Sequence, residues 1–258
     1  MKLYLKYISI HMKSIMQYKM SFFLTALGQF MVSFNVFLGV YFMFLLVPKV
    51  KGYSFGEVLL CFSIILMQFA LAECFARGFD SFSSVISNGE FDRIMVRPRN
   101  EIIQVLGSRF EFTRIGRMLQ AIIMFVYSIY KSDIDWDFYK VITLLFMLIG
   151  GFAVFCGLFL IYAALCFFTT QGLEFMNIFT DGAREFGKYP VNVYGKGVLL
   201  FCTYVIPFAL FQYYPLLYLL EKTTNKVNMV LPLASILFLF PCFILWKIGL
   251  RHYKSTGS

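Results

Sequence analysis

The sequence has little charge for its length. Only 14% of its 258 residues are Asp, Glu, Lys or Arg, whereas about 25% is usual in a soluble globular domain. Apolar residues make up 60% of the chain, and 33 residues are Phe. Uncharged apolar runs of about 18 residues or more are typical of segments that cross a bilayer. The composition therefore indicates an integral membrane protein and excludes an ordinary soluble domain.

Residues that carry out catalysis are also scarce. The two histidines, His11 and His252, have no Cys, Asp or Glu at the spacing of a metal site. Neither G-x-S-x-G nor H-E-x-x-H is present. The stretch GKYPVNVYGKG is not a P-loop, because Gly197 follows Lys196 and Pro190 stands in the place of the first glycine. We therefore expect a chain that is not an enzyme by itself, does not hydrolyse ATP and binds no metal or cofactor.

No two cysteines have C-x-x-C spacing. All six lie in or at the edge of apolar runs: Cys61, Cys74, Cys156, Cys166, Cys202 and Cys242. In such surroundings a cysteine usually behaves as a small hydrophobic residue. Inert packing is therefore expected in preference to disulfides or a metal site.

Six apolar runs predict six membrane-spanning helices, because a lone strand would leave backbone groups unpaired in lipid. The predicted spans are residues 22–47, 58–76, 109–130, 141–169, 198–220 and 228–248. The third run is short unless its helix begins in the polar segment from Arg109 to Arg117. The chain is expected to form a single transmembrane domain, residues 1–258.

The central parts of these spans lack ionisable side chains. No Asp, Glu, Lys, Arg or His occurs in the following stretches: 22–47, 58–72, 118–130, 141–169, 198–220 and 228–246. Carriers coupled to protons or ions typically place such a group inside the membrane. A stand-alone secondary transporter is therefore disfavoured, although sodium coupling through backbone carbonyls stays open.

Lys and Arg are distributed unevenly between alternate connecting segments. With a cytoplasmic N-terminus, the inside segments carry four, seven, three and three of them, and each outside loop carries two. This asymmetry follows the positive-inside rule and predicts that both chain ends are cytoplasmic. It also accounts for the net charge of +9 without a nucleic-acid partner.

The N-terminal residues, 1–20, predict an amphipathic helix. Polar residues recur every three or four positions at Lys2, Lys6, Ser9, Lys13 and Gln17. A helix of this kind, with lysines on its wet face, is suited to lie in the headgroup layer and contact membrane lipid. The alternative is a simple helical extension of the first span.

The segment between the second and third spans is longer than a turn requires. Residues 77–114 mix charged residues with apolar ones, a pattern typical of a short helix that docks on a partner. Within it, Asn88-Gly89 indicates a turn, and Pro98 redirects the chain. The alternative is a solvated loop whose charges serve only the topology.

Three stretches resemble the permeases of ABC transporters of the ABC-2 type, and more narrowly the bacterial six-span branch of about 260 residues. The first is VISNGEFDRIMVRPRNEIIQVLG, the second is FGKYPVNVYGKG and the third is IPFALFQYYPLLYLL. In the first, the matching residues are Gly89, Glu90, Asp92, Arg97 and Pro98. The second is carried by Lys188, Tyr189, Pro190 and Tyr194, and the third by Pro207 and Pro215.

The resemblance implies an all-α, ABC-2 (type V exporter-like) permease fold and a non-catalytic subunit of an exporter in the bacterial cell membrane. Two copies of a separate ATPase subunit, which hold ATP and Mg, and a second permease, identical or homologous, are the implied partners. A coupling segment at about 84–100 would contact the ATPase. Its expected contact residues are Gly89, Glu90, Phe91, Asp92, Arg93, Arg97 and Pro98. The pathway or a re-entrant region is expected at Pro207, Gln212, Tyr213, Tyr214 and Pro215.

The uncharged, aromatic-rich spans favour an amphipathic substrate such as a drug, an antimicrobial peptide or a glycolipid-like molecule. A second hypothesis is a membrane-embedded binding or assembly protein that docks a cytosolic partner without transport. A third is a membrane enzyme. An ATPase subunit that purifies with the chain would favour the transporter, and activity of the isolated chain would favour the enzyme.

Overall fold

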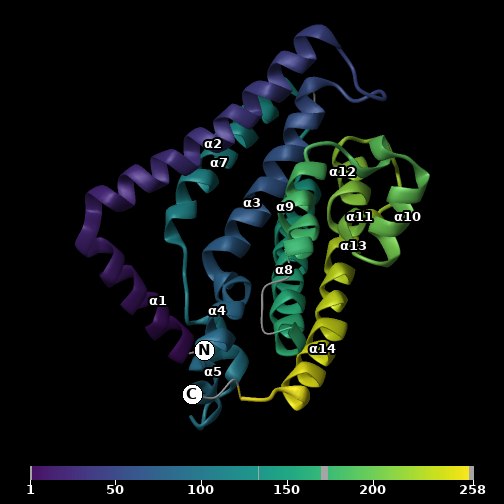
Figure 1. Cartoon of the computed structure of the whole chain (residues 1–258). Coiled ribbons are helices and arrows are strands. Elements are labelled where there is room, and N and C mark those ends of the chain that lie inside the picture. Colours follow the sequence, from purple (N-terminus) through teal and green to yellow (C-terminus); the bar gives the residue numbers. More distant parts are fainter. Residues whose placement is uncertain (1, 133, 170–173, 256–258) are drawn as a thin grey trace.

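The computed structural model describes residues 2–132, 134–169 and 174–255, and within these ranges every named element is a helix (Figure 1). The longer helices are α1 (Lys2–Ile15), α2 (Lys19–Leu46), α3 (Phe55–Asp80), α7 (Ile115–Lys131), α8 (Phe138–Thr169), α9 (Asn177–Phe186) and α14 (Leu239–His252). The shorter α-helices are α4 (Phe82–Ser87), α5 (Glu90–Met95), α6 (Glu101–Leu106), α10 (Lys196–Tyr204), α11 (Phe208–Phe211), α12 (Tyr213–Leu219) and α13 (Val227–Ala234). The 3-10 helices are η1 (Met16–Tyr18), η2 (Phe112–Arg114), η3 (Glu174–Met176), η4 (Val191–Tyr194) and η5 (Ser235–Phe238). The predicted all-α class is confirmed.

Helix α3 lies at the centre of the molecule. Its side chains are buried at almost every position, and it packs against α7 on one side and α8 on the other. A capping box begins it: Ser54 N–H donates to the Glu57 carboxylate at 2.8 Å, and Glu57 N–H donates to the Ser54 hydroxyl at 3.4 Å. Helix α8 packs in turn against α13 and α14, while α2 covers α7 at the other edge (Figure 1).

The contact between α2 and α7 requires a glycine. A Cβ added to Gly116 would lie 1.8 Å from the carbonyl oxygen of Ala26, far inside van der Waals contact. The outer side of α2 carries large exposed hydrophobic residues, among them Phe23, Leu27 and Phe42. Helix α2 therefore has one side fixed to the bundle and one side open to lipid or to another subunit.

Three loops lie together at one end of the bundle, which we call the loop face. They are residues 47–54, 134–137 and 220–226. Lys222 Nζ lies 2.6 Å from Glu57 and 4.1 Å from the ring centroid of Tyr53, and Lys140 Nζ lies 2.5 Å from Glu221. Burial raises the pKa of Tyr53 to about 12, so its phenol stays neutral below the ammonium group.

The opposite end, which we call the terminal face, holds α1, the α4–α6 segment and the end of α14. The Tyr4 hydroxyl donates to the carbonyl of Phe75 at 2.8 Å, and burial raises the pKa of this phenol. The Tyr253 hydroxyl donates to Asp92 at 3.0 Å. The three loops predicted outside thus share one face, and the segment predicted inside, 77–114, shares the other with both described chain ends.

Helix α1 is amphipathic, as the sequence predicts. Lys6, Ser9, Lys13 and Gln17 are exposed along one side. On the other side, Tyr4 and His11 both contact the ring of Phe110, at centroid distances of 5.3 Å. The N-terminal helix is therefore attached to the α6–η2 connection and meets α2 at an angle (Figure 1).

The predicted spans differ from the observed helices in two places. Four continuous helical stretches are long and apolar enough to cross a membrane: Leu3–Leu46, Phe55–Ser87, Phe138–Thr169 and Val227–His252. The third predicted span does not begin at 109, because α7 starts at Ile115 and has 17 residues. Residues Arg109 to Glu111 are not helical: Phe110 packs against α1, and Glu111 joins the ion-pair cluster described below.

The predicted fifth span, 198–220, is not a single helix. Helix α10 ends at Tyr204, α11 begins at Phe208, and the two halves meet at 89°. Pro207 stands at this break, where its missing N–H and fixed φ interrupt the helix. Pro215 causes no second break, because it lies in the first turn of α12, where a missing N–H is tolerated.

Residues 170–197 connect the predicted fourth and fifth spans, and the second half of this segment does not lie on the terminal face with 77–114. Residues 170–173 lie outside the described residues, but α9 runs along α3 toward the loop face. Gly187 accepts a hydrogen bond from the Cys61 thiol at 3.5 Å, and Asn192 lies beside Tyr53 of the loop face. Because Lys222 is also on the loop face, the α10–α12 hairpin enters and leaves the bundle on that side.

Candidate functional site

The predicted coupling segment, 84–100, spans the turn from α4 into α5 and the loop that leads to α6. Gly89 has φ of +68°, in the left-handed region that favours glycine, and this conformation turns the chain between the two helices. Pro98 lies in the following loop, and the Asn100 side chain caps α6 by accepting the Ile103 N–H at 3.2 Å. The segment is therefore an ordered hairpin of short helices on the terminal face.

An aromatic cluster fixes this hairpin to two spans. Phe91 is fully buried, and its ring lies 5.2 Å from Phe82 and from Phe167 of α8. Trp246 of α14 lies 4.9 Å from Phe167 and 5.2 Å from Phe82. Edge-to-face aromatic contacts of this kind add about 0.5–1.5 kcal/mol each beyond burial. The α4–α6 hairpin, α8 and α14 are therefore packed together on the terminal face.

Two residues predicted to contact a partner turn inward. Phe91 forms part of the aromatic cluster, and the Asp92 carboxylate accepts hydrogen bonds from Tyr253 at 3.0 Å and Ser255 at 2.6 Å. Asp92 thus ties the end of the described chain to α5. A docking partner has no access to Phe91 in this structure.

The remaining predicted residues form an exposed tip. Glu90, Arg93, Arg97 and Pro98 are exposed, and beside them Val96 has 83% of its surface exposed. Among the described residues, Glu90, Arg93 and Arg97 make no ion pair and no side-chain hydrogen bond. We call Glu90, Arg93, Met95, Val96, Arg97 and Pro98 the coupling tip, a surface where one apolar side chain is surrounded by free charges.

The structure also contains an ion-pair cluster that the sequence analysis missed. Glu73 of α3 is 3% exposed, pairs closely with Arg117 of α7 and lies 3.3 Å from Arg114. Arg77 lies 2.6 Å from Asp80 and 3.4 Å from Glu111, which also pairs with Arg114 at 2.8 Å. The buried and half-buried members are Glu73, Arg77, Asp80, Glu111, Arg114 and Arg117, and the more exposed Arg109 also pairs with Glu111, at 3.4 Å. In the part of the cluster that is shielded from solvent, three acids therefore meet three arginines, so each buried charge has a partner.

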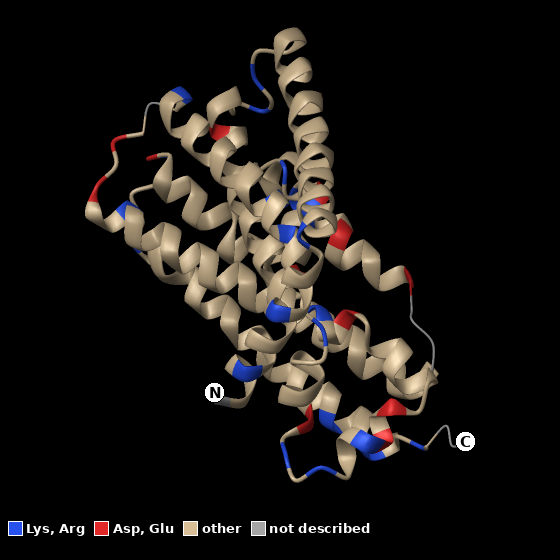
Figure 2. Cartoon of the chain, turned by 90° about the vertical axis from the view of Figure 1, so that its left-hand side faces the viewer, with Lys and Arg blue, Asp and Glu red and all other residues tan. Residues whose placement is uncertain are grey.

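The cluster joins three spans. The side-chain oxygen of Gln29 in α2 accepts hydrogen bonds from Arg114 at 2.7 Å and from Arg117 at 3.0 Å. Figure 2 shows acidic and basic residues grouped midway along the bundle as well as at its ends. The signal was present in the sequence, because Glu73 lies inside the predicted span 58–76. The uncharged stretch 58–72 ends one residue before Glu73, so this stretch did not show a charge inside the span.

Helix α9 adds a second row of charge at membrane depth. The guanidinium of Arg184 lies 5.3 Å from the ring centroid of Phe69, and that of Arg117 lies 5.6 Å from the same centroid. Further along, Lys188 pairs with Glu185 and lies 6.0 Å from the ring of Phe62. At 1.5 Å per residue, Phe62 is roughly 10 Å and Phe69 roughly 21 Å from the start of α3. Both therefore lie within the thickness of a bilayer.

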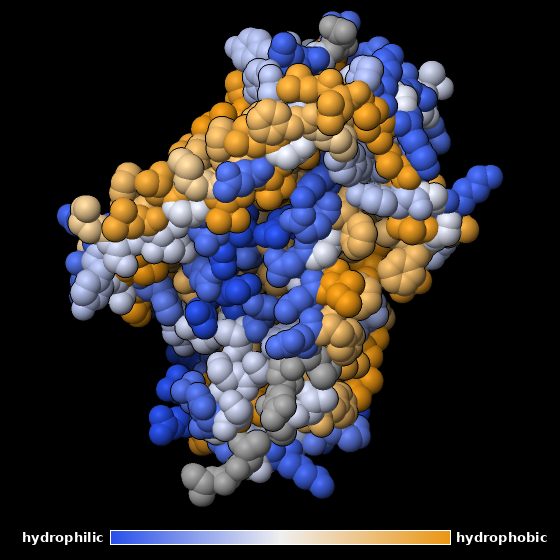
Figure 3. Space-filling view, turned by 45° about the horizontal axis from the view of Figure 1, so that its top comes forward, coloured by the Kyte–Doolittle hydropathy of each residue, from blue (hydrophilic) through white to orange (hydrophobic). Residues whose placement is uncertain are grey.

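These charges line a hollow between α2 and α9. Ser33 of α2 faces Arg184 and Glu185 across a small pocket. Figure 3 shows hydrophilic surface gathered in the middle of this side of the molecule, with hydrophobic surface on its flanks. Charged side chains inside a membrane face a water-filled cavity or another protein rather than lipid. In a membrane these charges are therefore expected to face water or another protein.

Two of the predicted motifs meet at the loop-face side of α9. The Gln212 amide donates to the carbonyl of Gly187 at 2.7 Å, next to Lys188. The Tyr189 hydroxyl donates to the sulfur of Met43 at 3.2 Å, and the Tyr194 hydroxyl donates to the carbonyl of Phe186 at 3.0 Å. Pro190 begins η4. These contacts join the end of α9 to α2 and to the α10–α12 hairpin.

Tyr213 and Tyr214 lie on the other side of this region. Their rings are 5.2 Å apart, Tyr213 lies beside Tyr53 on the loop face, and the Tyr214 hydroxyl is 3.4 Å from that of Thr203 in α10. The predicted re-entrant residues thus link the two arms of the hairpin to each other and to the loop face.

A family model described as "ABC-2 family transporter protein" matches residues 30–257, most of the chain. The chain belongs to the ABC-2 transporter family. This match confirms the resemblance found in the three motifs, and it means that the chain is a transmembrane permease that works with ABC ATPase subunits. Comparisons with curated proteins and with solved structures found no match to this ABC-2 permease.

Proposed function

We propose that this ABC-2 permease is the membrane subunit of a bacterial exporter. Two separate ATPase subunits bind and hydrolyse ATP, and a second permease, identical or homologous, completes the transporter. The terminal face lies in the cytoplasm, and the loop face lies outside. The single observation that carries the proposal is the coupling tip, because it combines free charge and exposed Val96 on the face that holds both described chain ends.

Topology supports this orientation. In the proposed topology the fifth crossing is the whole segment from η3 through α9 to η4, because α9 alone has only ten residues, and the α10–α12 hairpin enters the membrane from outside. Together with α2, α3, α7, α8 and α13–α14, this arrangement preserves six crossings and two cytoplasmic chain ends. The Lys and Arg of 77–114 then lie inside, as the positive-inside rule favours.

Motion at the coupling tip has two routes into the membrane. The aromatic cluster connects α5 to α8 and α14 through Phe91 and Trp246. Helix α6 presses closely on α3, since a Cβ on Gly78 would lie 2.0 Å from the carbonyl oxygen of Val105. Beyond it, the ion-pair cluster joins α3 to α2 and α7. A rigid displacement of the α4–α6 hairpin by the ATPase is thereby passed to five spans, which are α2, α3, α7, α8 and α14.

The hollow supports a two-permease assembly and a polar route for cargo. Its charges cannot face lipid, so a second permease that covers the α2 side would close a hydrophilic passage between two subunits. The passage would carry both signs of charge next to aromatic and aliphatic surface. That mixture fits amphipathic cargo, such as a drug, an antimicrobial peptide or a glycolipid-like molecule, moved outward.

The test is a charge reversal at the coupling tip. Arg93→Glu combined with Arg97→Glu should reduce binding of the ATPase subunit at least tenfold, which corresponds to about 1.4 kcal/mol. The ATPase is identified in the purified complex by its P-loop peptide, and its ATP turnover is measured in nanodiscs. Neither arginine has an ion pair among the described residues, so the variant should insert and purify normally.

The matched control reverses two charges on the loop face, with Lys131→Glu and Lys226→Glu. This variant should retain the ATPase and its turnover. Wild-type ATPase binding and turnover in the Arg93/Arg97 variant would exclude the coupling role. ATPase binding without ATP-dependent movement of any amphipathic cargo would favour the alternative, an assembly protein that docks a cytosolic partner without transport.

A further inference from the structure

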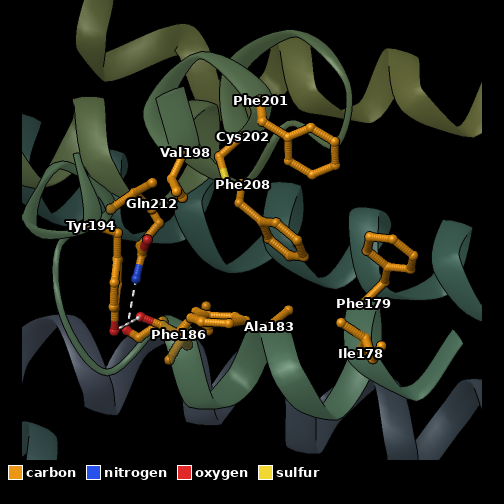
Figure 4. A pocket seen from close by; sticks show the side chains of 13 residues that line it. Ile178, Phe179, Ala183, Phe186, Tyr194, Val198, Phe201, Cys202, Phe208 and Gln212 are labelled. Carbon is orange, nitrogen blue, oxygen red and sulfur yellow. Dashed lines mark hydrogen bonds between the residues drawn. The ribbon is translucent and has the colours of Figure 1, made fainter. Parts of the chain in front are cut away.

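A cavity of about 400 Å³ lies between α9 and the α10–α12 hairpin. Ile178, Phe179, Val198, Phe201 and Phe208 supply much of its wall, with Ile65 of α3 among the remaining lining residues (Figure 4). The volume is within the range of about 300–1,000 Å³ that is usual for small-molecule sites in proteins. The cavity is separate from the coupling tip and from the charged hollow.

Helix α9 separates the cavity from the hollow. Its charged residues, Asp181, Arg184 and Glu185, occupy one side of the helix, whereas Phe179 and Ala183 line the cavity from the other side. At 100° per residue these two sets lie on opposite faces. The cavity therefore lies on the apolar side of α9 and is not part of the charged hollow.

The surroundings of the cavity favour an apolar occupant. Ile65 is ten residues into α3, so the cavity lies roughly 15 Å from the start of that helix, at hydrocarbon depth. A water molecule needs two to four polar partners, and this wall offers almost none. The side chains of Ile178, Phe186 and Phe201 are about half exposed, so the cavity opens outward among hydrophobic residues. Entry is therefore from the bilayer.

One end of the cavity is polar. Figure 4 shows Tyr194 and Gln212 at that end and Ile178 and Phe179 at the other. Gln212 is 1% exposed, and its side-chain nitrogen donates to the Gly187 carbonyl at 2.7 Å. This bond fixes the orientation of the amide, because a flipped amide would set two oxygens against each other. Its oxygen then has no hydrogen-bond partner among the described residues.

We propose that the cavity binds a single-chain amphiphile from the bilayer, with its alkyl chain along the apolar wall and a hydroxyl donor at the Gln212 end. The donor would satisfy the buried amide oxygen, and the chain would fill the space between α9 and α10. Such a ligand would hold the outer hairpin against α9. The proposal does not depend on the coupling role, because the two sites share no residue.

The test uses a tetradecanol analogue that carries a photoreactive diazirine, with the full chain in nanodiscs of phosphatidylcholine. After illumination, mass spectrometry should locate saturable label on peptides from residues 174–212. Unlabelled tetradecanol should compete, and its methyl ether, which lacks the donor, should compete about two- to tenfold more weakly, as expected for one hydrogen bond. Equal competition by alcohol and ether would overturn the assignment of the donor to Gln212.

Variants that fill the cavity test the site itself. Cys202→Trp, or Val198→Phe if the first variant is not monodisperse, should lower labelling of these peptides at least tenfold. Ile149→Trp places the same bulk at an exposed position of α8 and should leave labelling unchanged. Labelling that does not saturate, or that persists in both filled variants, would overturn the proposal. Loss of ATPase coupling through the tip would have no bearing on either result.

Discussion

At the scale of single residues, Glu73 has the most demanding environment in the described chain. It is almost fully buried in α3, and three arginines surround its carboxylate. The low dielectric of the interior makes an unpaired charge costly, so each member depends on the others. The buried Nε of Arg117 has no hydrogen-bond partner in the described structure. Arg117 therefore depends strongly on its ion pair with Glu73.

We predict that Glu73→Gln destabilises the protein by about 3–5 kcal/mol, because it leaves Arg117 and Arg114 without their shared carboxylate. The measurement is the Tm of the purified protein in detergent. Arg117→Gln should have a comparable effect. The double variant should lose less stability than the sum of the two single variants, since the groups interact directly.

The control for this cycle is Asp135→Asn, an exposed loop residue whose carboxylate makes no ion pair among the described residues. Its Tm should stay at the wild-type value. Strictly additive losses in the double variant would mean that Glu73 and Arg117 do not stabilise each other.

At the scale of elements, α9 and the hairpin after it have the least expected positions. A polar segment read as a cytoplasmic connection becomes a helix beside α3, because its charges find partners on one face while its apolar face encloses a cavity. The following apolar run bends by 89° at the break that contains Pro207. Its second half ends near Lys222 on the loop face.

We predict that Lys196→Cys and Lys51→Cys, the latter on the loop face, both react with a membrane-impermeant maleimide in intact cells. Arg99→Cys, on the terminal face, should react only after permeabilisation. Each variant is made in a chain whose six native cysteines are replaced by Ala. Protection of Lys196→Cys to the same degree as Arg99→Cys would return residues 170–197 to the cytoplasmic side.

At the scale of the whole molecule, the two long sides differ in polarity. The side with α2 and α9 has the charged hollow, whereas α8 exposes hydrophobic residues such as Leu145 and Ile149. An isolated copy in a bilayer would leave the hollow against lipid, which is unfavourable for charged groups. This difference in polarity supports the proposed second permease on the hollow side.

We predict that Val32→Cys, on α2 beside the hollow, forms a dimer with a short bis-maleimide in native membranes. Val32 is 56% exposed, and Leu145→Cys, at 53% exposure on α8, is the matched control that should remain monomeric. The readout is the apparent mass on a denaturing gel. Cross-linking of Leu145→Cys in place of Val32→Cys would locate the partner on the opposite side.

The sequence alone determined the all-helical membrane class, the positions of four long apolar helices and the family. These follow from local signals, such as apolar runs longer than a bilayer is thick and the Gly-acid-Arg-Pro pattern around Gly89 and Pro98. Only the tertiary structure decided that Glu73 meets Arg117, that Phe91 faces inward, and that α9 rises toward the loop face. Each of these depends on pairing between residues far apart in the chain. A buried charge is tolerated only when such partners are present, so local composition could not reveal which charges are buried.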